Sequence, residues 1–176
     1  MMLVVSPEKC TGCRACEVFC SLSHEGQAIP ELSRIKVWKA EARNTFLPIV
    51  CPPCTERPCL SACPEEGALS LRQDGAVVVE ESLCTGCCKC LRACELGAIT
   101  LHRLEGRGKH GKAVVLKCDL CDGEPWCVKV CQPGAVVTAE ASSSAGRSAF
   151  ARLTELRRSA EAEMAELGLR ARREPR

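Results

Sequence analysis

The chain has 176 residues, a formal net charge of +2 and 46% hydrophobic residues, and its 17 cysteines belong to that hydrophobic share. This length permits one or two small domains, and an aromatic content of 3% leaves few large side chains to fill a core. No run approaches 18 consecutive apolar residues, which excludes a predicted membrane-spanning helix.

The first cysteine motif, residues 10–20, has the spacing C-x2-C-x2-C-x3-C. Cys10, Cys13 and Cys16 on a tight loop can take three corners of an iron–sulfur cubane, while Cys20 points to a second cluster. Such a motif is incomplete alone and needs a partner motif. Apolar residues 2–5 before it predict a strand. The pattern at 14–21 predicts a helix that carries Cys16 and Cys20 on one face.

The middle of the chain continues with a strand, a second motif and a hairpin. Residues 33–40 alternate between polar and apolar, which is typical of a strand, and Trp38 is expected to pack against the protein body. In the second motif, prolines prevent a helix where the loop must wrap a cubane. Residues 67–71 and 76–80 predict a hairpin around a turn at 73–75. The cysteines of the second motif are Cys51, Cys54, Cys59 and Cys63.

Two further motifs complete a grid of sixteen cysteines. The third comprises Cys84, Cys87, Cys90 and Cys94, and the fourth comprises Cys118, Cys121, Cys127 and Cys131. Residues 97–101, 113–116 and 134–137 predict strands, and the glycine-rich loop 106–111 lacks the Walker pattern and predicts a turn. The chain therefore carries internal repeats, each with a strand, a cysteine loop, a short helix and a strand. Cys88 is left over and is expected to be a packed free cysteine.

The tail differs in composition from the rest of the chain. Residues 142–146 predict a flexible joint, and 147–167 have a helical pattern with an apolar stripe. The stripe consists of Phe150, Leu153, Leu156, Ala160, Met164 and Leu167. It can pack on the chain's own core or dock on another polypeptide, and the joint favours docking.

The four motifs in this order, with Pro58-Cys59, Cys63-Pro64 and a Gly-Ala pair after the later motifs, resemble the four-cluster ferredoxin-like electron-transfer subunits of oxidoreductase complexes. The short fourth motif is most similar to the small subunit of tungsten-containing aldehyde oxidoreductase or to the ferredoxin associated with carbon monoxide dehydrogenase. This resemblance implies an α+β fold with a duplicated bacterial ferredoxin-like unit. The outer unit would be 1–46 and 107–140, the inserted unit 47–106, and the joint and C-terminal amphipathic docking helix 141–176.

The resemblance also implies which cysteines share a [4Fe–4S] cluster, since the family pairs the first motif with the fourth and the second with the third. The four implied sets are Cys10, Cys13, Cys16 and Cys131; Cys118, Cys121, Cys127 and Cys20; Cys51, Cys54, Cys59 and Cys94; and Cys84, Cys87, Cys90 and Cys63. The three histidines, His24, His102 and His110, show no metal-ligand spacing and are expected to be surface or structural residues.

The implied function is electron transfer along four [4Fe–4S] clusters, without catalysis by this chain. The implied partners are a catalytic subunit and a further redox subunit, with self-association through 147–167 as another possibility. The alternatives are a free-standing polyferredoxin that shuttles between enzymes and a zinc-binding scaffold, because four thiolates also bind zinc.

The net charge and the first residues of the sequence limit which partners and which cellular compartment we expect. A cubane with its four thiolates is a dianion, so four clusters would change the charge from +2 to about −6, which disfavours a nucleic-acid partner. The first residues show no apolar signal-peptide core before Cys10. We therefore expect a cytoplasmic location, where disulfides are rare and a disulfide framework is disfavoured.

Overall fold

Four antiparallel two-stranded sheets form the frame of the protein within the part of the chain that the structure describes. The structure is a computed structural model that describes residues 1–40, 45–52, 54–103, 106–109, 111, 113–140, 151, 154–159, 161–162 and 165. Short helices accompany these sheets. The architecture is a ferredoxin-like α+β fold.

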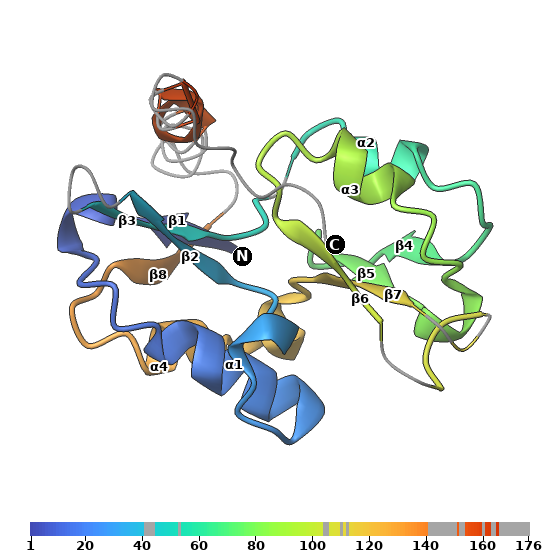
Figure 1. Cartoon of the computed structure of the whole chain (residues 1–176), viewed down its shortest axis with the longest axis horizontal. Helices are drawn as coiled ribbons and strands as arrows, with labels where there is room; N and C mark the ends of the chain where they lie inside the picture. The colour runs from blue at the N-terminus through green and yellow to red at the C-terminus, as the bar shows by residue number, and fades with distance from the viewer. Residues whose placement is uncertain are drawn as a thin grey trace.

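Two of the sheets lie beside helices α1 and α4, on the left of Figure 1. The elements are β1 (Met2–Val5), α1 (Ala15–Glu25), β2 (Lys36–Ala40), β3 (Thr45–Ile49), α4 (Trp126–Lys129) and β8 (Val136–Ala139). Strand β1 pairs with β8 and β2 pairs with β3. The β1–β8 register aligns Met2 with Ala139, so the two ends of the cysteine-bearing part of the chain lie side by side.

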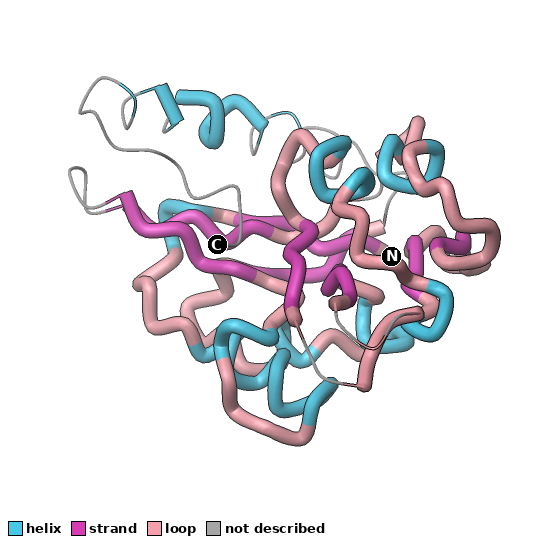
Figure 2. The backbone as a smooth tube through the Cα atoms, turned by 45° about the vertical axis from the view of Figure 1, so that its right-hand side comes forward, coloured by secondary structure: helices cyan, strands magenta, loops and turns pink. Residues whose placement is uncertain are grey.

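The other two sheets lie with helices α2 and α3 on the right of Figure 1. The elements are α2 (Pro58–Ser61), β4 (Leu69–Leu71), β5 (Val77–Val79), α3 (Lys89–Ala93), β6 (Ile99–His102) and β7 (Val114–Lys117). Strand β4 pairs with β5, and β6 pairs with β7. Single 3-10 turns complete the described elements: η1 (Pro7–Lys9), η2 (Pro30–Leu32), η4 (Glu81–Leu83) and η5 (Leu120–Gly123). Figure 2 shows the strands through the middle of the molecule, with helices on both sides.

Two hydrophobic clusters, built from aliphatic side chains and cysteines, form the core. The first contains Leu3, Ile35, Leu47, Ile49, Val50, Ala76, Leu96, Ala98, Leu120 and Val136, together with Cys16, Cys20 and Cys127. The second contains Leu32, Leu69, Val77, Ile99, Val114, Val115 and Leu116, together with Cys84 and Cys90. No aromatic side chain is among these buried residues, as the composition predicted. Trp38 packs against the first cluster while partly exposed, which confirms its expected contact with the body.

Each predicted strand is present, although several are shorter than predicted or begin two or three residues later, and one further strand was not predicted. The predicted strand at 33–40 begins only at Lys36. The buried Ser33 hydroxyl donates to the Ile35 carbonyl at 2.6 Å and accepts from the Ile35 N–H at 3.1 Å. Because this local turn occupies the backbone groups that a ladder would use, Ser33 stays outside the sheet. Strand β3 was not predicted; it carries Pro48, which usually argues against a strand.

Strand pairing does not follow the domain boundaries that the sequence implied. Strand β7 lies in the range assigned to the outer unit, yet it pairs with β6 of the inserted range. Strand β3 crosses the boundary between residues 46 and 47. The first core cluster joins Leu3 to Ala76 and Ala98. Cysteine spacing locates the motifs, but strand pairing depends on which strands lie side by side in the folded chain.

The described part of the tail lies on the body of this chain. Residues 154–159 are helical, and Leu156 packs against the first core cluster. The Arg157 guanidinium lies against the Gly97 backbone, and Arg158 pairs with Glu95 at 3.8 Å. The other stripe residues, Phe150, Leu153, Ala160, Met164 and Leu167, lie outside the described residues. No described helix has the length and apolar character needed to cross a membrane.

Candidate metal centre

Left-handed backbone positions shape the cysteine loops. Gly12 and Gly86 have φ of 70° and 66° within the first and third motifs. Arg14, Arg57 and Cys88 are also left-handed, and each directly precedes one of the helices α1, α2 and α3. Alternation of left- and right-handed residues turns successive N–H groups toward one side of the loop, which creates a concavity suited to anions. The loops are therefore built to surround negatively charged sulfur.

Backbone N–H groups donate directly to cysteine sulfurs. The Arg34 N–H donates to Cys20 Sγ at 3.2 Å, and the Ala98 N–H donates to Cys94 Sγ at 3.3 Å. Both cysteines are the fourth of their motif, so their donors come from the segment that follows the motif helix. Hydrogen bonds of this kind stabilise the thiolate form over the thiol.

The first predicted set of cysteines comes together across the whole sequence. Burial raises the pKa of Cys10, and the neighbouring Cys13 and Cys131 raise it further. Burial also raises the pKa of Cys16 to about 12, with Glu17 and Cys10 as the next contributors. Pairing of β1 with β8 and packing of α1 against α4 bring Cys131 to the first motif.

The second set combines Cys20 of the first motif with the fourth motif. Burial raises the pKa of Cys127, with Cys20 and Cys121 as the next contributors. Burial raises the pKa of Cys118 well above its usual value, and Cys127 is among the charges that add to it.

The third and fourth sets combine the second and third motifs. Burial raises the pKa of Cys54 to about 11, followed by the charges of Cys51, Cys94 and Cys59. Burial raises the pKa of Cys90 to about 12, followed by Cys84, with Cys63 and Cys87 also contributing. The charges that act on Cys90 thus come from Cys84 and Cys87 of the third motif and from Cys63 of the second. Helices α2 and α3 pack together and carry these cysteines toward each other.

The arrangement is unfavourable for free thiolates and favourable for a bound cation. Four sulfurs in each set share a desolvated volume, where burial and mutual repulsion oppose ionisation. A metal reverses that balance, because thiolates are the ligand form and binding releases the protons. The structure thus brings together the members of each predicted set, while the ligation of individual clusters stays a prediction.

A cavity of about 310 Å³ lies among the third set, lined by Cys51, Cys54, Cys59 and Cys94 together with Lys117. Soft sulfur donors around one volume are the chemistry that iron–sulfur clusters and zinc select. A second cavity, of about 20 Å³, is lined by Cys63, Cys84, Cys87 and Cys90 of the fourth set, and also by Cys88.

Lys117 is a site residue that sequence reasoning missed. Its side chain is buried, with the residue 5% exposed, and Nζ donates to the Val77 carbonyl at 2.8 Å and the Cys118 carbonyl at 3.1 Å. Burial alone would lower the pKa of Lys117, yet the charge and hydrogen bond of Cys51 keep that pKa above its usual value. The residue ends β7 directly before Cys118, but no sequence pattern distinguishes it from a surface lysine.

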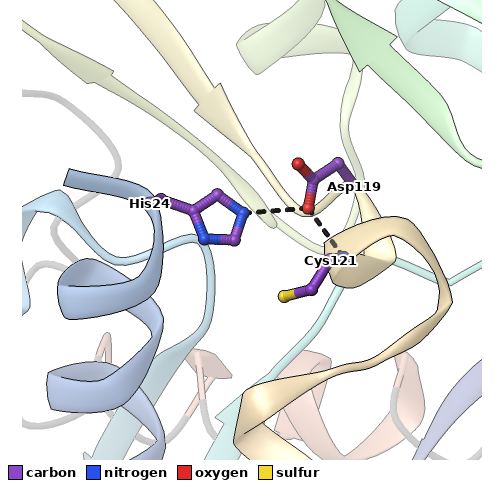
Figure 3. Close-up of side chains that lie close together, drawn as sticks. All are labelled: His24, Asp119 and Cys121. Carbon is purple, nitrogen blue, oxygen red and sulfur yellow. Dashed lines mark hydrogen bonds and ion pairs between the residues drawn. The ribbon is translucent and has the colours of Figure 1, made fainter. Parts of the chain in front are cut away.

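His24 forms a contact with the fourth motif that was also missed (Figure 3). His24 Nε2 and Asp119 Oδ1 are 3.0 Å apart, and the same oxygen accepts the Cys121 N–H at 2.9 Å. Burial would raise the pKa of Asp119, but the hydrogen bonds from His24 and Cys121 lower it to about 2. Ligand atoms of the three residues lie within 4.8 Å, although Cys121 already belongs to the second set. His24 is therefore structural, as expected, and connects α1 to the fourth loop.

Cys88 occupies the position in the third motif that Arg14 occupies in the first. Both are left-handed residues that directly precede a helix. The Cys88 thiol donates to the Gly86 carbonyl at 3.4 Å. Its role beyond this loop contact stays a prediction.

Comparison with known proteins identifies the family. Residues 42–141 match the 4Fe-4S dicluster domain. The chain belongs to this family. The match covers the second, third and fourth motifs, which contribute twelve of the sixteen grouped cysteines.

Curated relatives of this dicluster protein include subunits of oxidoreductases. The polyferredoxin-like subunit of an aliphatic sulfonate oxidoreductase from Pyrococcus furiosus is 44% identical over 92 residues, which are 52% of this chain and 53% of the relative. Hydrogenase-4 component A of Escherichia coli is 40% identical over 98 residues, 56% of this chain and 46% of the relative. The electron transport protein HydN of Escherichia coli is 35% identical over 102 residues, 55% of this chain and 57% of the relative. The chain thus spans about half the length of these relatives.

Among solved structures, a chain of the active site complex BamBC of benzoyl coenzyme A reductase with benzoyl-CoA is 26% identical. The alignment covers 93% of this chain and 88% of that chain, with a TM-score of 0.42. For the dicluster protein itself, the cofactors are of the [4Fe–4S] type, and its sixteen grouped cysteines are consistent with four clusters.

Gly12→Ala tests whether the close approach of the first cysteine loop to the Phe46 ring is needed for cluster binding. A Cβ at Gly12 would lie 2.4 Å from the Phe46 ring, whereas one at Gly26 would meet nothing within 4 Å. Both positions have positive φ, so both variants carry roughly 1–2 kcal/mol of backbone strain. We expect Gly12→Ala to hold less iron than the wild type after identical anaerobic reconstitution, and Gly26→Ala to hold the wild-type amount. Equal iron in both variants would show that close packing of this loop is unimportant.

Proposed function

We propose that this chain is an electron-transfer subunit of a multi-subunit oxidoreductase and holds four [4Fe–4S] clusters. The observation that carries the proposal is that cysteines from different motifs come together in four partly buried sets. A cation within each set would relieve the raised thiol pKa values that burial and neighbouring cysteines cause. Relatives named as electron transport proteins and oxidoreductase subunits support the same function.

Each cluster would have three ligands from one motif and one ligand from its partner motif. The proposed ligand sets are Cys10, Cys13, Cys16 and Cys131; Cys118, Cys121, Cys127 and Cys20; Cys51, Cys54, Cys59 and Cys94; and Cys84, Cys87, Cys90 and Cys63. This exchange of the fourth ligand follows the pattern of two-cluster ferredoxins.

The chain itself would hold the clusters and adjust their reduction potentials. A bound [4Fe–4S] cluster supplies one-electron redox chemistry. Burial of Cys16 and Cys127 keeps water from the sulfurs, and N–H donors such as those of Arg34 and Ala98 stabilise added negative charge. Substrate chemistry would then take place on the partner, without a catalytic residue in this chain.

The proposed partners are a catalytic subunit and a second redox subunit or acceptor. The short fourth motif favours a catalytic subunit of the tungsten aldehyde oxidoreductase type over larger membrane-anchored enzymes. We propose that this complex works in the cytoplasm, where thiols stay reduced and available to bind clusters. A free-standing polyferredoxin is the second candidate, and gel filtration of native extract separates the two by size.

We propose further that one ferredoxin-like unit is inserted in the other, and that the tail docks on a partner. Strand pairing supports an outer unit joined by β1 and β8 and an inserted unit that extends through β7, beyond the expected end at residue 106. Leu156 contacts this chain's own core, so the proposed docking concerns the other residues of the stripe, which lie outside the described residues. Self-association through 147–167 would be head-to-tail, and a contact that does not close gives a filament.

Metal analysis tests the cofactor content. We expect about 16 iron and 16 sulfide per chain in anaerobically purified protein, since each cubane contains four of each. A visible spectrum gives an independent reading, because an iron–sulfur protein is brown and a zinc protein is colourless. Eight iron or fewer in fully loaded protein, or stoichiometric zinc, would reject the four-cluster assignment.

Cys20→Ala tests the exchange of ligands between motifs. Because Cys20 is assigned to the set of Cys118, Cys121 and Cys127, its loss should change the paramagnetic signal of that cluster and leave the cluster of Cys10 intact. Cys88→Ala is the matched control, because Cys88 belongs to no proposed set, and all four signals should persist. Anomalous density that joined Cys20 to the cubane of Cys10, Cys13 and Cys16 would contradict the pairing.

Truncation after residue 141 tests the tail. No proposed ligand lies beyond Cys131, so the truncated protein should keep its iron, while co-purification with the partner should fail. The substitution Leu156→Ala in the full chain is the control, because Leu156 already packs on this chain's core. If the truncated protein still assembles in full stoichiometry and size, the tail is only a surface helix.

A further inference from the structure

A buried ammonium lies where two of the four cysteine sets meet. Lys117 is the last residue of β7, directly before Cys118 of the second set. Its side chain lines the cavity of the third set together with Cys51, and the charge of Cys51 raises the pKa of Lys117. Cys51 and Cys118 are themselves electrostatic neighbours, because Cys51 is the second contributor, after burial, to the raised pKa of Cys118. Lys117 thus touches both sets at their point of contact.

The charge of Lys117 has no acidic partner among the described residues. Its two oxygen acceptors are the neutral carbonyls of Val77 and Cys118. No described carboxylate lies within ion-pair distance, and the residue is 5% exposed. A buried charge without a counter-charge is strongly unfavourable, and the negative charges that act on Lys117 within the described part of the chain are those of Cys51, Cys118 and Cys59.

Lys36 provides a contrast within the same chain. Its Nζ also donates to two backbone carbonyls, Pro30 at 2.6 Å and Glu31 at 2.9 Å. The charges that act most on Lys36, after burial, are the carboxylates of Glu17 and Glu31. The two lysines therefore share local hydrogen bonding and differ in what balances the positive charge.

We propose that Lys117 sets the reduction potentials of the clusters held by the second and third sets, by keeping one positive charge between them. The inference rests on the proposed function. A one-electron reduction adds one negative charge to a set, and a nearby fixed cation stabilises that charge in a medium of low dielectric constant. Both potentials are raised together, so reduction of either cluster at this junction becomes more favourable.

The test measures potentials and not activity. Wild type, Lys117→Gln, Lys117→Met, Lys117→Arg and the control Lys36→Met are loaded anaerobically, and iron and sulfide are counted first. Potentiometric titration followed by electron paramagnetic resonance then resolves the couples. Lys117→Gln keeps a hydrogen-bond donor without the charge, Lys117→Met removes both, and Lys117→Arg restores the charge.

We expect Lys117→Gln and Lys117→Met to lower two of the four potentials and leave the other two unchanged. The ratio of reduced to oxidised cluster at a given poise should fall at least tenfold, which is about 59 mV for a one-electron couple. Lys117→Arg should stay near the wild type. Lys36→Met should leave the couple of the third set in place, because the cysteine charge that acts on Lys36 is that of Cys20 in the second set. If Lys117→Met fails to retain iron, Lys117→Gln decides.

Two kinds of failure are distinguishable. A fully loaded neutral variant whose four potentials are unchanged, or all shifted equally, overturns the role of Lys117 and leaves the proposed function intact. A wild-type protein with stoichiometric zinc, or with too little iron for four clusters, overturns the proposed function itself.

Discussion

The whole structure depends on bringing four soft sulfur donors, from two motifs far apart in sequence, into one desolvated volume. Cys10 and Cys131 come from opposite ends of the cysteine-bearing region, and they become neighbours because β1 pairs with β8. Packing desolvated cysteines together is unfavourable, because they repel one another as thiolates. A bound cation removes this repulsion, so cofactor binding stabilises the folded chain.

The local backbone follows from the same requirement. A loop that encloses a cluster must turn sharply and direct its N–H groups inward, so it uses left-handed residues at Gly12 and Gly86 and directly before three helices. Helices α2, α3 and α4 span one turn or little more, whereas α1 has eleven residues. The aliphatic core is correspondingly small, and the cysteines form part of it.

The two residues next to Cys118 in the sequence carry charges of opposite sign. The Lys117 ammonium lies toward the third set, while the Asp119 carboxylate is held by His24 and the Cys121 N–H. Lys117 is buried, so solvent screens its charge weakly, whereas the Asp119 side chain is 32% exposed. This loop therefore has a positive charge toward the third set and a negative charge toward α1.

Cysteine spacing and local alternation determined much of this protein from the sequence alone. The four motifs, most strands and the short helices were predictable, because a loop around a cubane and a strand period are properties of adjacent residues. The family resemblance supplied the partner of each motif, and the sulfur neighbourhoods agree with it. The apolar stripe of the tail was predictable from its helical spacing, but the surface that it contacts was not.

Only the tertiary structure decided which strands pair and which charges face the sulfurs. Strand β7 pairs with β6, a choice that depends on which strand edge lies beside it in the folded chain. Strand β3 forms despite Pro48 because its backbone hydrogen bonds with β2. His24 reached Asp119 across 95 positions, and Lys117 turned inward toward Cys51. Neither contact has a sequence signature, because the free energy that places a lysine or a histidine comes from neighbours that are distant along the chain.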